Sequence, residues 1–216
     1  MYMEEKGLLI TTSILSGLGF IYIDNLKQKY YQGNYDIIPL FHSIIVGLPS
    51  YYIYMKEPNI IMYLSETPGN IIPIIYKIIP CFTLGYGILD IYDSYRRKRI
   101  DFFVHGCIII FGYGSLLYYD GIYLAIMGNV NEMSTIFLNI AKTIYTKILF
   151  LIVFTYIRFY LYYQIMYKYF NTTPNNIIHY YIIMLFSLIF TALNCIWYKK
   201  MLTIMFNYKK MNNINK

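Results

Sequence analysis

The sequence predicts an all-α membrane protein, built as a single bundle of about seven transmembrane helices. Hydrophobic residues make up 58% of the 216 residues and charged residues only 13%, whereas charged residues are about a quarter of a soluble domain. Seven apolar segments approach the roughly 20 residues that a helix needs to cross a bilayer. The joints between them are short and hydrophilic, so we expect one domain and no linker.

The first two segments cover residues 7–24 and 37–55. The acidic start MYMEEKG and the lack of a small-residue cleavage site indicate a signal anchor rather than a cleaved signal peptide. We therefore expect residues 1–36 to form an N-terminal signal-anchor helix and a cytosolic loop. The second segment carries His42 close to its start.

The third and fourth segments, 71–92 and 101–118, flank a polar stretch in an otherwise apolar region. Asp90 lies near the end of the third segment and His105 near the start of the fourth. The joint between them, with Asp93 and the cations at 96–99, is expected to be solvated. The glycines at 85, 87, 112 and 114 indicate close contacts between helices.

The fifth segment, 121–140, is the weakest, because GNVNEMST at 128–135 interrupts its apolar run. It carries Glu132 and, near its end, Asn139. The sixth segment, 147–168, contains Arg158. The seventh, 177–198, contains Trp197, and residues 206–216 are expected to form a basic cytosolic tail.

Lysine and arginine residues are concentrated in every second joint, and this unequal distribution predicts the orientation of the chain in the membrane. The N-terminal tail and the second, fourth and sixth joints hold only Lys6, Lys56 and Lys168, while most other cations lie in the remaining joints and the C-terminal tail. The pattern places the N-terminus in the lumen or outside and the C-terminus in the cytosol. A sequon that begins at Asn171 falls on the predicted lumenal side, and its glycosylation stays open because Pro174 and the membrane are close.

Four ionisable residues are expected at a similar depth near the cytosolic surface. At 1.5 Å per residue, three of them lie roughly 5–8 Å below that surface and the fourth about 12 Å below it. Such residues usually face the bundle interior and mark a site. A histidine oriented by a carboxylate suits proton transfer or acyl relay. The sequence therefore predicts a catalytic cluster of His42, Asp90, His105 and Glu132.

Structural readings of the same residues stay open. Asp90 and His105 are also compatible with a hydrogen bond that only fixes helix packing. Arg158 is compatible with neutralising Glu132 or with contacting a lipid headgroup. His179 lies near the predicted lumenal face, apart from the cluster.

No metal and no nucleic acid are expected. The three cysteines lie inside apolar segments without metal-ligand or disulfide spacing, which indicates buried free thiols at Cys81, Cys107 and Cys195. The net charge of +7 is better explained by membrane topology, because the cations flank hydrophobic segments. The expected partner is a membrane lipid or a fatty acyl chain, with a homodimer as a further expectation.

Five segments, taken in order, resemble the TLC-domain family of translocating-chain-associating, longevity-assurance and ceroid-lipofuscinosis proteins. They span about residues 37–205, which would form the TLC domain, and they look closest to the small TLC-domain-containing multi-pass membrane proteins. The segments are FHSIIVGLPSYYIY (41–54), TLGYGILDIY (83–92), RIDFFVHG (99–106), NEMSTIFLN (131–139) and LNCIWYKKM (193–201).

The resemblance implies a TLC-type bundle with a central cavity, in the endoplasmic reticulum or a related membrane, that acts on lipids. Ceramide synthases, more distant relatives, N-acylate sphingoid bases from acyl-CoA with a pair of histidines and downstream acids. By similarity, His105 matches the first histidine and Gly106 stands in place of the second. Glu132 falls near the first downstream acid, and Thr135 replaces the second. The resemblance also suggests lipid-binding roles for Tyr86, Asn139, Arg158 and Trp197.

The expected function is therefore binding or modification of a lipid in membrane lipid homeostasis, with acyl-CoA-dependent acyl transfer as the candidate chemistry. No bound cofactor is expected, and acyl-CoA would be a co-substrate. The alternative is a non-enzymatic lipid-sensing or trafficking factor of the endoplasmic reticulum. A seven-helix receptor or transporter is disfavoured by the small lumenal loops and the lack of a visible repeat.

Overall fold

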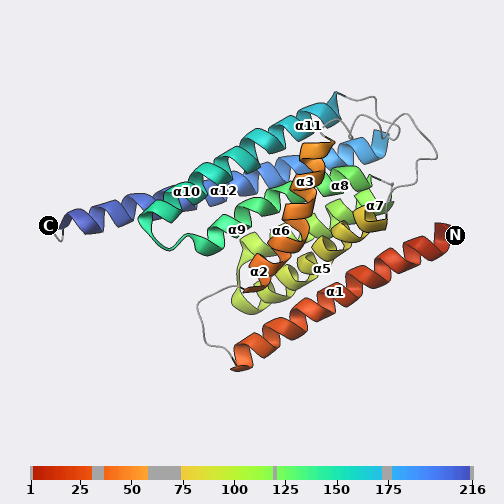
Figure 1. Cartoon of the computed structure of the whole chain (residues 1–216), viewed down its shortest axis with the longest axis horizontal. Helices are drawn as coiled ribbons and strands as arrows, with labels where there is room; N and C mark the ends of the chain where they lie inside the picture. Colours follow the sequence, from red (N-terminus) through yellow and green to blue (C-terminus); the bar gives the residue numbers. More distant parts are fainter. Residues whose placement is uncertain (1, 31–36, 58–73, 119–120, 172–176, 215–216) are drawn as a thin grey trace.

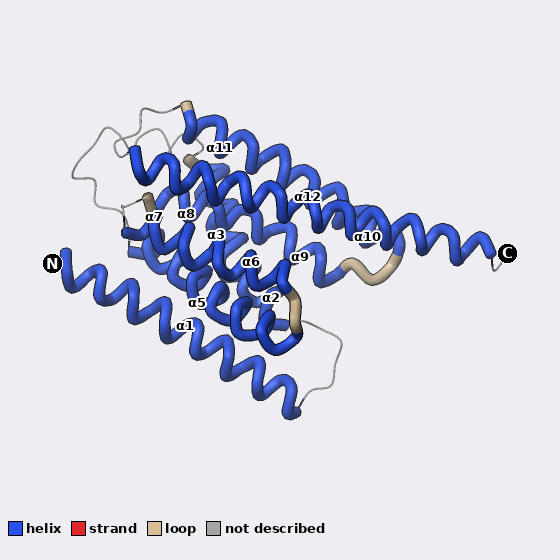
Figure 2. The backbone as a smooth tube through the Cα atoms, turned by 180° about the vertical axis from the view of Figure 1, so that it is seen from behind, coloured by secondary structure: helices blue, strands red, loops and turns tan. Residues whose placement is uncertain are grey.

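The computed structural model is helical almost throughout the residues that it describes, which are 2–30, 37–57, 74–118, 121–171 and 177–214. The helices form seven rods, four of which contain one irregular turn (Figures 1 and 2). The rods are α1 (Tyr2–Tyr30); α2 (Ile37–His42), η1 (Ser43–Gly47) and α3 (Leu48–Lys56); α5 (Ile74–Arg97); α6 (Ile100–Ile108), η2 (Ile109–Tyr113) and α7 (Gly114–Tyr118); α8 (Ile122–Asn129), η3 (Val130–Glu132) and α9 (Met133–Ile140); α10 (Ile144–Thr155), η4 (Tyr156–Leu161) and α11 (Tyr162–Phe170); and α12 (Ile177–Ile214).

The rods confirm the predicted all-α class, and each expected segment falls on one of them. The joint at 31–36, residues 71–73 of the third segment, and residues 172 and 173 of the sequon lie outside the described part of the chain. Helix α12 continues to Ile214, into the residues expected to form a tail. It extends past the other rods at the C-terminal end of the molecule (Figures 1 and 2).

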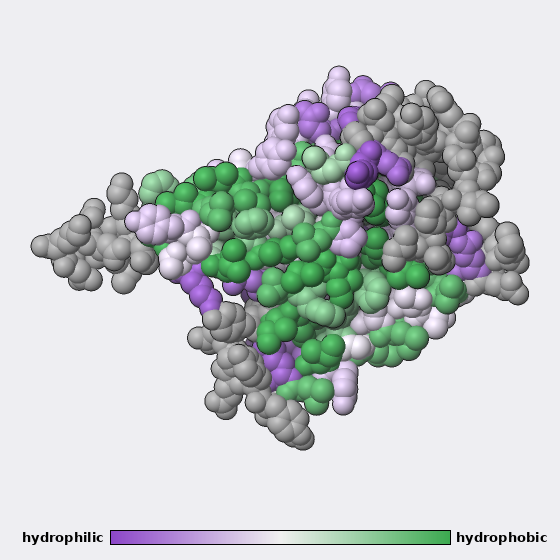
Figure 3. Space-filling view, viewed as in Figure 1, coloured by the Kyte–Doolittle hydropathy of each residue, from purple (hydrophilic) through white to green (hydrophobic). Residues whose placement is uncertain are grey.

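Five described rods are long and apolar enough to cross a membrane: Glu5–Gln28, Ile37–Lys56, Ile100–Tyr118, Ile144–Phe170 and Ile177–Asn207. The outer surface agrees with this, because many large apolar side chains are exposed on these rods. They form a broad hydrophobic area across the middle of the face in Figure 3. Contiguous apolar surface of this extent is typical of a lipid or protein interface.

The rod α8–η3–α9, whose segment was the weakest in the sequence, lies at the centre of the bundle. Ala125, Ile126 and Met127 in α8 have no exposed surface. Neighbouring rods shield α8 and η3, so polar side chains there can find protein partners instead of facing hydrocarbon. This explains why an interrupted apolar run still forms an interior helix.

Helix α1 packs along α5 through small residues and polar contacts. A Cβ atom at Gly85 would lie 2.6 Å from the backbone nitrogen of Gly17, so only glycine allows this approach. Near one end of the interface, the buried carboxylate of Asp24 pairs with Arg96 at 2.8 Å. Arg96 was expected in a solvated joint, but α5 continues to Arg97 and carries it against α1.

The α5–α6 hairpin is closed by a tight turn and an unusually close helix contact. Lys98 has a φ of 54°, and the backbone N–H of Arg99 donates to the carbonyl of Ser94 at 3.1 Å. A Cβ atom at Gly106 would lie 2.8 Å from the carbonyl oxygen of Gly87. The two glycines therefore let α6 approach α5 more closely than a side chain would permit.

The predicted glycine contacts are confirmed at 85 and 87 but are wrong at Gly114, where a Cβ atom would meet nothing within 4 Å, and Gly112 makes only ordinary contact. The prediction of buried thiols holds for Cys81, whereas Cys107 is half-buried and Cys195 is exposed. Both corrections have the same cause. A small residue in an apolar helix carries no sequence signal for the face on which it lies.

Candidate functional site

Irregular turns hold or adjoin several of the charged and ionisable residues of the bundle interior. His42 is the last residue before the π-helical turn η1, and Arg158 lies inside the π-helical turn η4. Glu132 lies in the short 3-10 turn η3, and His105 lies one helical turn before η2. Single π turns inside α-helices are frequent at functional sites, because they redirect side chains at a local cost in helix geometry.

Asp90 and His105 form a buried pair across the α5–α6 hairpin. His105 Nδ1 lies 2.7 Å from Asp90 Oδ2, and both side chains are less than a tenth exposed. Donation from Nδ1–H to the carboxylate leaves Nε2 with the lone pair, which is the arrangement of an oriented general base. The aromatic rings of Trp197 and Phe190 flank the imidazole at centroid distances of 5.3 Å and 6.3 Å.

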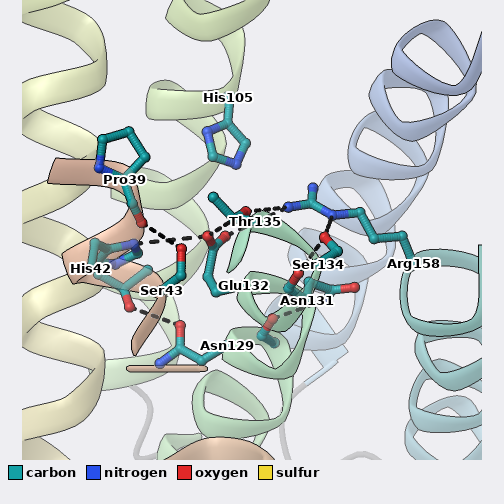
Figure 4. A network of polar contacts seen from close by, with 12 residues as sticks. Pro39, His42, Ser43, His105, Asn129, Asn131, Glu132, Ser134, Thr135 and Arg158 are labelled. Carbon is teal, nitrogen blue, oxygen red and sulfur yellow. Dashed lines mark hydrogen bonds and ion pairs between the residues drawn. The ribbon is translucent and has the colours of Figure 1, made fainter. Parts of the chain in front are cut away.

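Glu132 and Arg158 form a second buried group, and Thr135 connects them (Figure 4). The carboxylate lies 3.9 Å from an Arg158 nitrogen. The Thr135 hydroxyl donates to Glu132 at 3.2 Å and accepts from Arg158 at 3.4 Å. Arg158 also donates to Ser134 at 2.7 Å and to Asn194 at 3.2 Å. The guanidinium is thereby fixed in orientation although it lies in the bundle interior.

His42 lies behind this group rather than beside His105. Its imidazole has no exposed surface, stacks on the ring of Tyr86 at a centroid distance of 4.1 Å, and lies 3.8 Å from Glu132 through Nδ1. The predicted four-residue cluster is therefore two pairs, Asp90–His105 and His42–Glu132, with Arg158 attached to the second.

A cavity of about 560 Å³ opens beside both pairs, within the usual range of ligand pockets. Asp90, His105 and Glu132 line it, as do all four residues expected to bind lipid, whereas His42 does not. Those four are Tyr86, Asn139, Arg158 and Trp197.

A second, smaller cavity of about 80 Å³ shares His105 and Glu132 with the first. The rest of its lining is mainly apolar and includes Leu116, Ile183 and Phe186. His105 and Glu132, one member of each pair, therefore lie where the larger cavity meets a narrow apolar one. This arrangement suits an amphiphile with a polar group and a hydrocarbon chain.

Sequence reasoning missed several partners of these residues. Asn194 is fully buried in α12 and accepts from Arg158, and a lone amide in an apolar run was the signal for it. Asp101 lies at the mouth of the larger cavity and accepts from Trp197 Nε1 at 3.4 Å and from Lys200 at 2.9 Å. In the sequence, Asp101 looked like an ordinary acidic residue in the first turn of a helix.

Among the described residues, no group of three or more His, Cys, Asp and Glu side chains could hold a metal ion.

A family model of the TLC domain matches residues 35–203, most of the chain. The chain belongs to the TLC-domain family. No curated protein and no solved structure matches the sequence. A TLC domain makes the chain a membrane protein involved in lipid metabolism or sensing.

The helices are closely packed at Gly106, the position that the sequence resemblance matches to the second histidine of ceramide synthases. A side chain there would meet Ile91 as well as Gly87, with a Cβ atom 3.1 Å from the Ile91 backbone nitrogen. The position is occupied by helix packing and offers no room for a second histidine. At Thr135, where an acid is replaced, the hydroxyl joins Glu132 to Arg158 instead.

Proposed function

We propose that this chain binds an amphiphilic lipid inside the bundle and that His105 promotes acyl transfer to or from it. The observation that carries the proposal is the oriented Asp90–His105 pair at the meeting point of the two cavities. The hydrocarbon chain would enter the apolar cavity and the reacting group would lie at His105. Asp90 would orient the imidazole as a positioning residue, and Glu132 would contribute negative charge nearby.

The proposed step uses acyl-CoA as the acyl donor and an amine or hydroxyl as the acceptor. His105 Nε2 takes the proton of the acceptor as its nitrogen or oxygen attacks the thioester carbonyl. The carbon–sulfur bond then breaks, and the departing thiolate receives that proton from the imidazolium. The products are the acylated acceptor and free CoA, so atoms and charge balance with a single histidine.

We expect His105→Ala to lower acyl transfer by about 10²–10⁴-fold, the usual contribution of a general base. The measurement is transfer from labelled acyl-CoA to sphingoid bases and lysophospholipids in membranes that contain the protein. His179→Ala is the matched control, because this histidine lines neither cavity. Equal rates for His105→Ala and wild type would exclude His105 as the base.

A non-enzymatic lipid sensor is the second candidate function, and the close packing at Gly106 favours it. A site with one histidine and no room for the second can hold a ligand without turning it over. This candidate predicts saturable lipid binding by the folded protein without product from wild type or variant. His105→Ala would then change affinity alone.

We infer a location in the endoplasmic reticulum or a related membrane, with the N-terminus lumenal and the C-terminus cytosolic. The unequal distribution of cations between alternate joints supports this orientation. An N-glycosylation tag added before residue 1 should be modified, and the same tag after residue 216 should not. The reverse pattern would refute the orientation without affecting the cavity.

A further inference from the structure

The mouth of the larger cavity carries an excess of positive charge. Three cations line it from three different elements: Arg99 at the start of α6, Lys142 in the joint between α9 and α10, and Lys200 on α12. Asp101 is the acid among them, pairing with Lys200 at 2.9 Å and lying 3.7 Å from Arg99. The formal charge of the four side chains is therefore about +2 at neutral pH.

The deeper wall of the same cavity is different. Asp90 faces His105, and Glu132 lies beside Arg158, so the acids there are not outnumbered by cations. Cations outnumber acids at the mouth, where the Arg99 and Lys200 side chains are half exposed. An anion drawn to the cavity would thus be held at its entrance and not beside His105.

We propose that Arg99, Lys142 and Lys200 form a phosphate subsite for an amphiphile whose hydrocarbon chain extends from this mouth past His105 toward the apolar cavity. This inference rests on the proposed lipid-binding function and names the chemical class of the ligand. A phosphate monoester carries about −1.5 to −2 charge at pH 7, which matches the excess at the mouth. Arginine presents a planar fork to phosphate oxygens, and lysine adds a point charge.

Asp101 competes with the ligand for the same cations. It pairs with Lys200 and lies near Arg99, and a bound phosphate must take these contacts over. Removal of the Asp101 charge should therefore strengthen phosphate binding, whereas removal of a cation should weaken it. A role for Asp101 in folding alone would not produce these opposite signs.

The chain provides its own probe, because Trp197 is its single tryptophan and lines the cavity. Purified protein in detergent is titrated with hexadecyl phosphate and with hexadecanol, which share a chain and differ in the phosphate. Trp197 fluorescence reports occupancy. Each ligand partitions into the detergent to the same extent whichever variant is present. This partitioning cancels in the ratio of the Kd of a variant to the Kd of wild type, so the ratio reports the contacts with the protein.

We expect Lys200→Gln and Arg99→Gln to weaken hexadecyl phosphate binding by about tenfold each, which corresponds to about 1.4 kcal/mol. Asp101→Asn should tighten it several-fold, since an asparagine oxygen still accepts from Trp197. Lys199→Gln is the matched control, because this neighbouring lysine does not line the cavity. Hexadecanol binding should be the same in every variant, and only phosphate binding should weaken with added salt.

Two outcomes would overturn the subsite. The phosphate subsite would be refuted if Lys200→Gln, Arg99→Gln, Asp101→Asn and Lys199→Gln all bound hexadecyl phosphate like wild type. If both ligands still changed Trp197 fluorescence, the proposal of a lipid-binding cavity would remain supported. If neither ligand changed the fluorescence of folded protein, the proposed function would fail with it. Lysophosphatidic acid and palmitoyl-CoA distinguish the source of the phosphate. Dependence of lysophosphatidic acid binding on Lys200 would identify a lipid headgroup. Dependence of palmitoyl-CoA binding on Lys200 would identify an acyl carrier.

Discussion

Gly106→His should destabilise the protein and abolish acyl transfer or ligand binding, although it supplies the histidine that the resemblance to ceramide synthases leads one to expect there. Even a Cβ atom at this position would lie 2.8 Å from the Gly87 carbonyl oxygen and 2.8 Å from a side-chain carbon of Ile91. Overpacking by a few atoms costs about 1–3 kcal/mol, and an imidazole adds more atoms than that. Helix α6 must then move from α5, which breaks the Asp90–His105 contact.

The measurements are the thermal midpoint in detergent and the change in Trp197 fluorescence on ligand addition. Gly114→His is the matched control in the same rod, since a Cβ atom there meets nothing within 4 Å. It should keep both properties near wild type. A stable Gly106→His protein with higher transfer activity would show that the helices tolerate the side chain, and would contradict the packing explanation of this departure.

The fold was largely predictable because membrane helices reveal themselves by apolar length. All seven segments fall on helical rods, including 121–140, which burial at the bundle centre explains. The irregular turns were not predictable, because π and 3-10 turns leave no clear mark in composition. They decide how the side chains near His42, Glu132 and Arg158 are directed.

The sequence predicted which residues belong to the candidate site but not which of them form pairs. Depth along each segment brought His42, Asp90, His105 and Glu132 to one level, and three of them line one cavity. Depth says nothing of rotation about the helix axis, so the sequence did not show that His42 stacks on Tyr86 instead of lining the cavity. Asn194 and Asp101 were missed because their partners are distant in sequence.

Glu132→Ala should lower the stability of the protein by about 3–5 kcal/mol, because it leaves the Arg158 guanidinium buried without its anion. Both side chains are less than a tenth exposed. Thr135 would lose the carboxylate to which it donates. Arg97→Ala is the control, since its ion pair with Asp93 is largely exposed and such pairs contribute about 0–1 kcal/mol.

The double variant Glu132→Gln with Arg158→Met separates charge pairing from packing. Removal of both charges leaves no uncompensated ion, so the double variant should be more stable than Glu132→Gln alone. Denaturant or thermal unfolding in detergent gives the four stabilities of this double-mutant cycle. Additive losses would mean that the 3.9 Å separation carries no coupling. If the double variant recovered stability but not ligand binding, the buried pair would serve ligand binding in the cavity and not the stability of the bundle.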